Sequence, residues 1–167
     1  GILASGGTVE NQGLVSAQAI AGANALGASV GVEGQVNGVG AGAAFVDTST
    51  RTDAAAAAID GREADGVVSY GAFAADAQSH SYAESVGVDV KGQANGVSLG
   101  AALSFSGVSG DAEAVGIWGG AGDDFVVNYG NSAVSALDTA NSLGVSVGVL
   151  GQINGVGITG AFADTST

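Results

Sequence analysis

The stretch with the clearest capacity for chemistry is a glycine- and aspartate-rich segment that runs from Gly119 to Val127. It reads Gly-Gly-Ala-Gly-Asp-Asp-Phe-Val-Val. Glycines permit a tight turn whose backbone carbonyl groups point inward, and aspartates supply carboxylate oxygens. Because Ca²⁺ binds about six to eight such oxygens, the segment is a candidate calcium site. The residues that would form it are Gly119, Gly120, Gly122, Asp123 and Asp124.

These nine residues match every fixed position of the nonapeptide GGxGxDxUx, in which U is an apolar residue, here Val126. The chain therefore resembles RTX-type repetitive extracellular bacterial proteins, and its long Gly-, Ala-, Val- and Thr-rich repeats resemble those of large repeat adhesins. The resemblance implies calcium as a cofactor bound at the glycine-rich turn. RTX sites form between consecutive nonapeptides, whereas in this chain single copies lie a whole repeat apart.

A degenerate equivalent of the segment lies one repeat earlier, at residues 60–68. It keeps Asp65 and Val67, lacks two of the glycines and gains Arg62. If the two copies stack, carboxylates of the earlier copy could complete the ligand set. Those carboxylates belong to Asp60, Glu63 and Asp65. The alternative is a structural turn, rich in Gly and Asp, that once bound calcium and no longer does.

The other residues with catalytic side chains do not converge on a site. His80 is the only histidine and the chain has no cysteine. Ordinary zinc sites and Cys/His nucleophilic chemistry are therefore excluded. The positions equivalent to His80 are Gly22 and Thr139, which indicates a solvated strand face. We expect that the protein is not an enzyme.

The elements that position these turns are organised by a hexapeptide, GQxNGV, that occurs three times. Its copies begin at Gly34, Gly92 and Gly151, which are 58 and 59 residues apart. Asn-Gly is a strong signal for a tight β-turn because both residues tolerate positive φ. An alternating strand precedes each turn and a strand of small residues follows it. The preceding strands are predicted at Val30–Val32, Val88–Val90 and Val147–Val149.

The repetition extends well beyond the hexapeptide. Residues 26–50 and 143–167 are identical at 18 of 25 positions. Internal repeats of this kind are typical of stacked architectures. We expect an all-β repeat architecture, either a β-solenoid or stacked long β-hairpins, with about 58 residues per repeat. Residues 1–167 would form one continuous array, with approximate repeats 1–58, 59–116 and an incomplete 117–167.

Alternation of small apolar residues with other residues between Val9 and Ala25 favours a strand with one packed face over a helix. The apolar phase then changes at Gly27, Ser85 and Gly144. A phase change at a small residue predicts a β-bulge or a corner.

Stacked repeats would align equivalent side chains in ladders. Apolar ladders are expected at Val30/Val88/Val147 and Phe45/Leu103/Phe162, and amide ladders at Gln35/Gln93/Gln152 and Asn37/Asn95/Asn154. The alternative for the Gln and Asn residues is that each serves only its own turn.

Charge limits the partners. Three basic residues against 16 acidic ones give a net charge of −13. Such a surface repels phosphate backbones, so we expect no nucleic-acid binding, and it argues against anionic membrane surfaces. Because every run of 18 apolar residues is interrupted by Gly, Ser or charge, we also expect no membrane insertion. An acidic chain suits an extracellular or cell-surface location.

The expected function is a structural extracellular fibre, stalk or adhesin segment. Repeat arrays expose unpaired strand edges, so the expected partner is a further copy, joined end to end in a filament or longer array. The alternative is a calcium-dependent module that binds a carbohydrate or another surface ligand through its turns.

Overall fold

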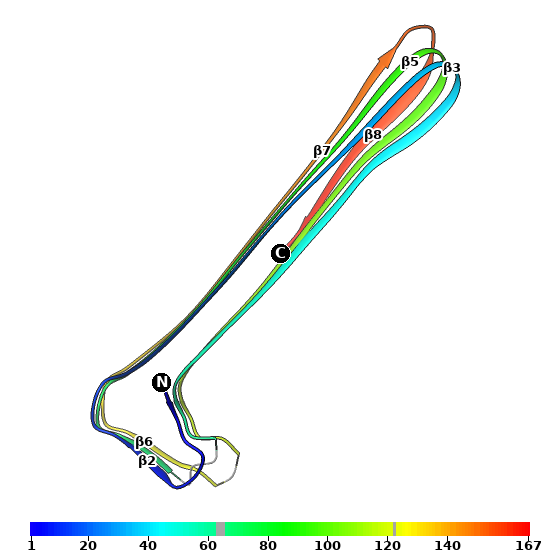
Figure 1. Cartoon of the computed structure of the whole chain (residues 1–167). Helices are drawn as coiled ribbons and strands as arrows, with labels where there is room; N and C mark the ends of the chain where they lie inside the picture. The colour runs from blue at the N-terminus through cyan, green and yellow to red at the C-terminus, as the bar shows by residue number, and fades with distance from the viewer. Residues whose placement is uncertain (63–65, 122) are drawn as a thin grey trace. The chain divides into compact units, whose positions relative to one another are not determined.

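The computed structural model describes residues 1–62, 66–121 and 123–167, and it places strands but no helix among them. The prediction of an all-β chain is therefore confirmed. Among the described residues there is no helix with the length and apolarity needed to cross a membrane. The strands are β1 (Ile2–Leu3), β2 (Thr8–Asn11), β3 (Val15–Asp60), β4 (Gly66–Ser69), β5 (Phe73–Trp118), β6 (Phe125–Asn128), β7 (Ser132–Gln152) and β8 (Gly155–Ser166) (Figure 1).

The strands pair in two sheets. One sheet has the order β1-β3-β5-β7 with β8 also paired to β5, and the other has the order β2-β4-β6. In the smaller sheet Thr8 lies opposite Gly66, and Gly66 lies opposite Phe125, both in parallel pairs. β8 runs parallel to β5, with Gly96 opposite Gly155. These partners are 58, 59 and 59 residues apart, the same separations as between the hexapeptide copies.

Two compact units take segments from all along the chain. The first comprises residues 1–22, 52–80 and 110–139, and the second comprises residues 23–51, 81–109 and 140–167. β3 and β5 therefore each contribute residues to both units.

The first unit has an alanine-rich core. Side chains at alternate positions of β3, from Val15 to Ala21, pack against it, as the sequence alternation predicted. Small side chains suffice because the strands that face one another lie close together. The buried members are Ala54, Ala56, Ala58, Phe73, Ala75 and Ala77.

A corner precedes β3 and β5 in this unit, and sequence analysis missed it. The Asn11 side chain accepts a hydrogen bond from the Gly13 backbone N–H at 3.1 Å and donates one to Ser69 Oγ at 3.0 Å. Ser69 Oγ in turn donates to the Gly71 carbonyl at 3.0 Å. The signal was present as Asn-x-Gly or Ser-x-Gly at residues 11–13, 69–71 and 128–130. Short polar side chains that bond two residues ahead are typical of such turns.

In the second unit the chain reverses at each hexapeptide, within β3, within β5 and between β7 and β8 (Figure 1). Gly38 and Gly96 have φ values of 122° and 140°, and Asn154 has a φ of 53°. The predicted turns are therefore confirmed. The two limbs that leave each turn face one another, as the hydrogen bond from Ser104 Oγ to the Ser85 carbonyl at 2.8 Å shows.

The Gln and Asn side chains of the hexapeptides form both kinds of contact that the sequence left open, bonds within their own turn and bonds to the neighbouring copy. Gln35 Nε2 donates to Val39 O of its own turn at 3.1 Å. Gln93 Nε2 instead donates to Gly38 O of the preceding copy at 3.1 Å. Asn95 Nδ2 contacts Asn37 Oδ1 at 3.4 Å, which begins an amide ladder.

The interior between the limbs is narrow, and glycines on one limb face the larger side chains of the other. A Cβ on Gly42 would lie 2.6 Å from Lys91 Nζ and 2.8 Å from Glu33 Oε2. A Cβ on Gly100 would lie 2.7 Å from Lys91 Cε. Any larger residue at these glycines would therefore displace the Glu33–Lys91 pair.

The predicted bulge or corner at Gly27, Ser85 and Gly144 is wrong. β3, β5 and β7 continue through these residues. Alternation is unbroken from Val15 to Val36 of β3, so Val30 and Val32 face outward and are 68% and 77% exposed. The sequence phase changes because the narrow interior accepts glycine, serine and a few polar side chains, which leaves the large aliphatic residues on the outside. Val30 and Val32 therefore lie in a strand, as predicted, but their side chains face outward rather than into the interior between the limbs.

Two glycines of one turn give a matched test of this close packing. Gly96 has positive φ and a Cβ there would collide with the Gly38 carbonyl oxygen, whereas a Cβ on Gly92 would meet nothing within 4 Å. We expect Gly96→Ala to lower the free energy of unfolding by about 2–4 kcal/mol. Gly92→Ala should change it by less than about 1 kcal/mol. Denaturant unfolding of both variants measures the difference, and equal effects would contradict the close stacking of the turns.

Candidate functional site

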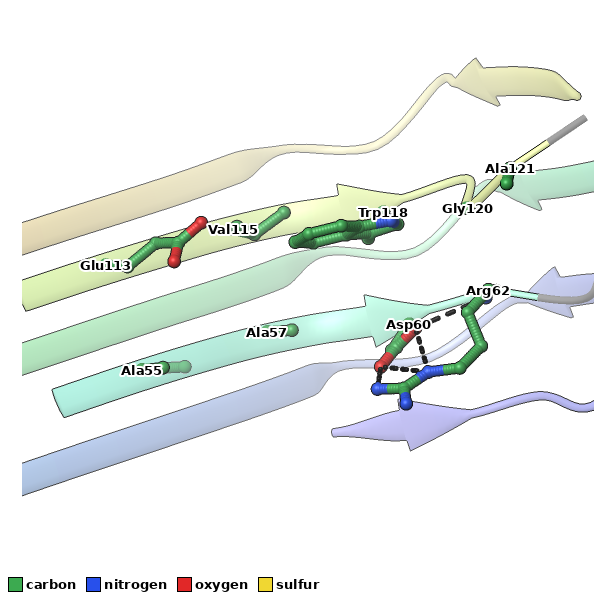
Figure 2. Close-up of a pocket in the computed structure, with 10 residues that line it drawn as sticks. Ala55, Ala57, Asp60, Arg62, Glu113, Val115, Trp118, Gly120 and Ala121 are labelled. Carbon is green, nitrogen blue, oxygen red and sulfur yellow. Dashed lines mark hydrogen bonds and ion pairs between the residues drawn. The ribbon is translucent and has the colours of Figure 1, made fainter.

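A groove of about 680 Å³ opens in the first unit beside the candidate calcium turn. Its apolar part comes from alanines of β3 and from Val115 and Trp118 of β5, and its polar part from Asp60, Arg62 and Glu113. Figure 2 shows the Asp60–Arg62 pair at the end of β3, with Trp118 on another strand. The complete lining is Ala55, Ala56, Ala57, Asp60, Arg62, Glu113, Val115, Trp118, Gly120 and Ala121.

The groove forms where two equivalent turns meet. The Gly61 N–H donates to the Trp118 carbonyl at 2.8 Å, which joins the end of β3 to the end of β5. Gly120 has a φ of 97°, and a Cβ there would collide with the backbone of Arg62. The structure thus brings together the glycine-rich turn and its degenerate equivalent. Only glycine permits this approach.

Arg62 holds the carboxylate of Asp60. Arg62 Nη2 lies 2.5 Å from Asp60 Oδ2, Nε lies 3.2 Å from the same oxygen, and the Arg62 backbone N–H donates to Oδ1 at 3.2 Å. The side-chain hydrogen bond from Arg62 is the largest influence on the pKa of Asp60, and it helps to hold that pKa below its ordinary value. A calcium ion that used Asp60 would have to compete with this guanidinium group.

The other predicted calcium residues are placed in part. A Cβ on Gly119 would lie 3.3 Å from Asp124 Oδ2, so the Asp124 side chain folds back over its own turn. Asp123 is exposed. Gly122, Glu63 and Asp65 lie outside the described residues. Within the described ranges no three His, Cys, Asp or Glu side chains gather in an arrangement that could hold a metal ion. The calcium site stays a prediction.

Trp118 is the residue of this site that sequence analysis did not single out. Its side chain is half exposed on the groove, and it is the only tryptophan of the chain. An exposed indole ring flanked by charged groups can stack against a flat ligand while those groups accept or donate hydrogen bonds. The available signal was its position directly before the glycine-rich turn. His80, as expected, lies exposed on a strand.

The pKa of Asp60 provides a test of the Asp60–Arg62 pair. Arg62→Gln should raise this pKa toward the ordinary value of 3.8 because the charged donor is lost. Since the folded-state pKa is lowered, the pair stabilises the fold above the unfolded-state pKa, and this contribution disappears as pH falls through the folded-state value. Carboxyl chemical shifts followed by NMR across acidic pH report the change. If the pKa of Asp60 stays the same in Arg62→Gln, the hydrogen bond from Arg62 is not what lowers it.

Calcium binding at the glycine-rich turn is tested by thermal unfolding. If the turn binds Ca²⁺, a chelator lowers the melting temperature because bound ligand stabilises the folded state. Asp124→Ala should abolish that response. Asp111→Ala removes an exposed carboxylate of the same unit outside the turn, and it should leave the response intact. A melting curve that excess chelator does not change leaves only the structural-turn alternative.

The groove and its turn thus offer an aromatic surface, an ion pair and a candidate cation site in one unit. No family model, curated protein or solved structure matches this chain.

Proposed function

We propose that this chain is part of a β-solenoid with about 58 residues per turn, and that it serves as a structural extracellular fibre, stalk or adhesin segment. The observation that carries the proposal is the parallel register. Thr8, Gly66 and Phe125 align across three strands, and Gly96 aligns with Gly155. Each alignment joins residues one sequence repeat apart, as expected if every repeat adds one layer to a stack.

The partner of such a stack would be a further layer that pairs with the strand edges left open at its end. In the described part of the chain, β7 and β8 each pair with β5 alone, so each has one edge that no other described strand covers. Because the pairing is parallel and the repeats are equivalent, that edge has the hydrogen-bonding pattern that the first layer can accept. Such head-to-tail contacts propagate as an open filament. The next layer can belong to the same polypeptide or to another copy.

The chemistry of the surface supports a non-enzymatic role outside the cell. The net charge of −13 keeps a long assembly soluble and repels nucleic acid and anionic lipid. The only histidine is exposed, and the candidate cation site lies in a turn rather than beside a nucleophile. A stalk or adhesin needs layers that resist separation, which long parallel ladders of backbone hydrogen bonds provide.

The groove favours a second candidate, a calcium-dependent module that binds a carbohydrate or another surface ligand. Trp118 offers a stacking surface directly before the candidate calcium turn, with Glu113 on the same strand. Trp118 is the only tryptophan, so its fluorescence reports on this groove without labelling. A fluorescence change on adding oligosaccharide that disappears with chelator would favour this candidate over a purely structural role.

Small-angle X-ray scattering over a wide concentration series tests the fibre. We expect particle length to grow with concentration while the cross-section of each filament stays constant, because copies add through strand edges. The measurement should be made near physiological salt, where repulsion between acidic chains is screened beyond about 8 Å. A compact particle of 15.7 kDa at every concentration would contradict non-covalent end-to-end growth.

A further inference from the structure

The second unit has its charged side chains inside and its aliphatic side chains outside near the hexapeptide turns. Asp89 and Lys91 are 1% and 2% exposed, and Lys91 Nζ lies 2.5 Å from Glu33 Oε2. Buried oxygens without a hydrogen-bond partner among the described residues gather in the same interior, including Gln35 Oε1, Asp89 Oδ2 and Gln93 Oε1. The polar side of these strands therefore faces inward.

The opposite side of the limbs that follow the turns forms a surface that we call the apolar face. It contains no charged residue. Val39, Phe45, Val97, Leu99, Val156, Ile158 and Phe162 are its large exposed members, each 48 to 77% exposed. Ala41, Ala43, Ala101, Leu103 and Gly160 lie between them.

The apolar face is continuous across the three copies. Leu99 lies opposite Ile158, and Leu103 opposite Phe162, in the parallel pair of β5 and β8. Phe105, which follows in β5, packs its ring 5.6 Å from that of Phe45 and 6.1 Å from that of Phe162. The seven exposed side chains leave an area on the order of 800 Å², which is about what one partner contributes to a stable specific interface.

We propose that the apolar face packs against the same face of a second copy of this chain. The inference rests on the proposed fibre function, since it says how fibres would join side by side. Two β-sheets pack face to face at about 10 Å through side chains of this kind. An exposed apolar surface of this size is typical of an interaction site. Within one copy the face stays exposed, because the strands of the second unit turn their polar side inward.

The size of the apolar face fits a second copy as the occupant, because it matches the area that one partner contributes to a stable interface. Each chain carries −13, so two copies repel one another over most of their surfaces, and the apolar face is a region where they can approach without bringing charges together. Asp47 and Asp164 lie just beyond the phenylalanines at one end. A two-fold arrangement with the strands antiparallel across the interface places these carboxylates at opposite ends.

The test uses two single variants of the apolar face, Leu99→Glu and Ile158→Glu. A third single variant adds the same charge elsewhere and serves as the control. Leu14→Glu is the control, because Leu14 is 76% exposed and belongs to the first unit. Sedimentation velocity should show that either face variant raises the dissociation constant for side-by-side association at least about tenfold, which is 1.4 kcal/mol. Leu14→Glu should leave it unchanged.

A gentler variant guards against misfolding. Val97→Thr combined with Val156→Thr keeps β-branched side chains of similar shape while adding hydroxyl groups to the face. It should weaken association less than the glutamates while the circular dichroism spectrum stays that of strands. If all face variants fold and associate as strongly as the unsubstituted chain, the proposal is overturned.

The outcomes separate this inference from the fibre itself. Filaments whose cross-section is that of a single copy at every concentration would overturn the face-to-face contact and leave the fibre standing. Face-dependent dimers that never elongate would support the contact and contradict non-covalent end-to-end growth. Monomers that float with phosphatidylcholine vesicles, and lose this binding in Leu99→Glu, would show a lipid surface as the occupant and overturn the proposal.

Discussion

The close approach of the two limbs of each repeat is the constraint on which the second unit depends. Glu33 and Lys91 fit between the limbs because Gly42 and Gly100 face them. Serine hydroxyls bridge the same gap, as between Ser104 and Ser85. An interior this thin has no room for continuous rows of Val, Leu and Phe, so most of these side chains lie outside, where the single copy leaves them exposed. The apolar surface is thus a direct consequence of the narrow interior.

The Glu33–Lys91 pair, in which Lys91 is buried and the Glu33 side chain is 34% exposed, shows what the polar interior contributes. The Lys91 side chain is 1% exposed, so its desolvation offsets much of the attraction to Glu33. The third copy carries Leu150 at the equivalent position, and Leu150 lies against Gly157 across the gap. The interior therefore accepts either an ion pair or a leucine of similar length. Because only adjacent layers place Glu33 beside Lys91, we infer that the pair specifies register more than it adds stability.

Local patterns predicted local structure, whereas the direction in which each strand faces depended on packing between limbs. GQxNGV located all three turns, and the alanine alternation located the strand and core of the first unit. The outward orientation of Val30 and Val32 was not predictable from hydrophobicity. It follows from the narrow gap between the two limbs of the repeat, which leaves no space for these side chains inside. At the groove, the sequence identified Asp60 and Gly120, but not that Arg62 would occupy the Asp60 carboxylate or that Trp118 would line the site. The Asp60–Arg62 contact is local to one turn, whereas Trp118 joins the site only because two turns one repeat apart are stacked.

Residues one repeat apart lie side by side in parallel strands, and paired spin labels test this stacking most directly. The chain has no native cysteine, so Leu99→Cys with Ile158→Cys, and Val68→Cys with Val127→Cys, can be labelled cleanly. Both pairs are register partners in this structure, and neighbouring strands lie about 4.8 Å apart. Labelled chains diluted with unlabelled ones should show strong dipolar broadening for both pairs, relative to the sums of their single-label spectra. Double-label spectra that equal those sums would contradict the stacking.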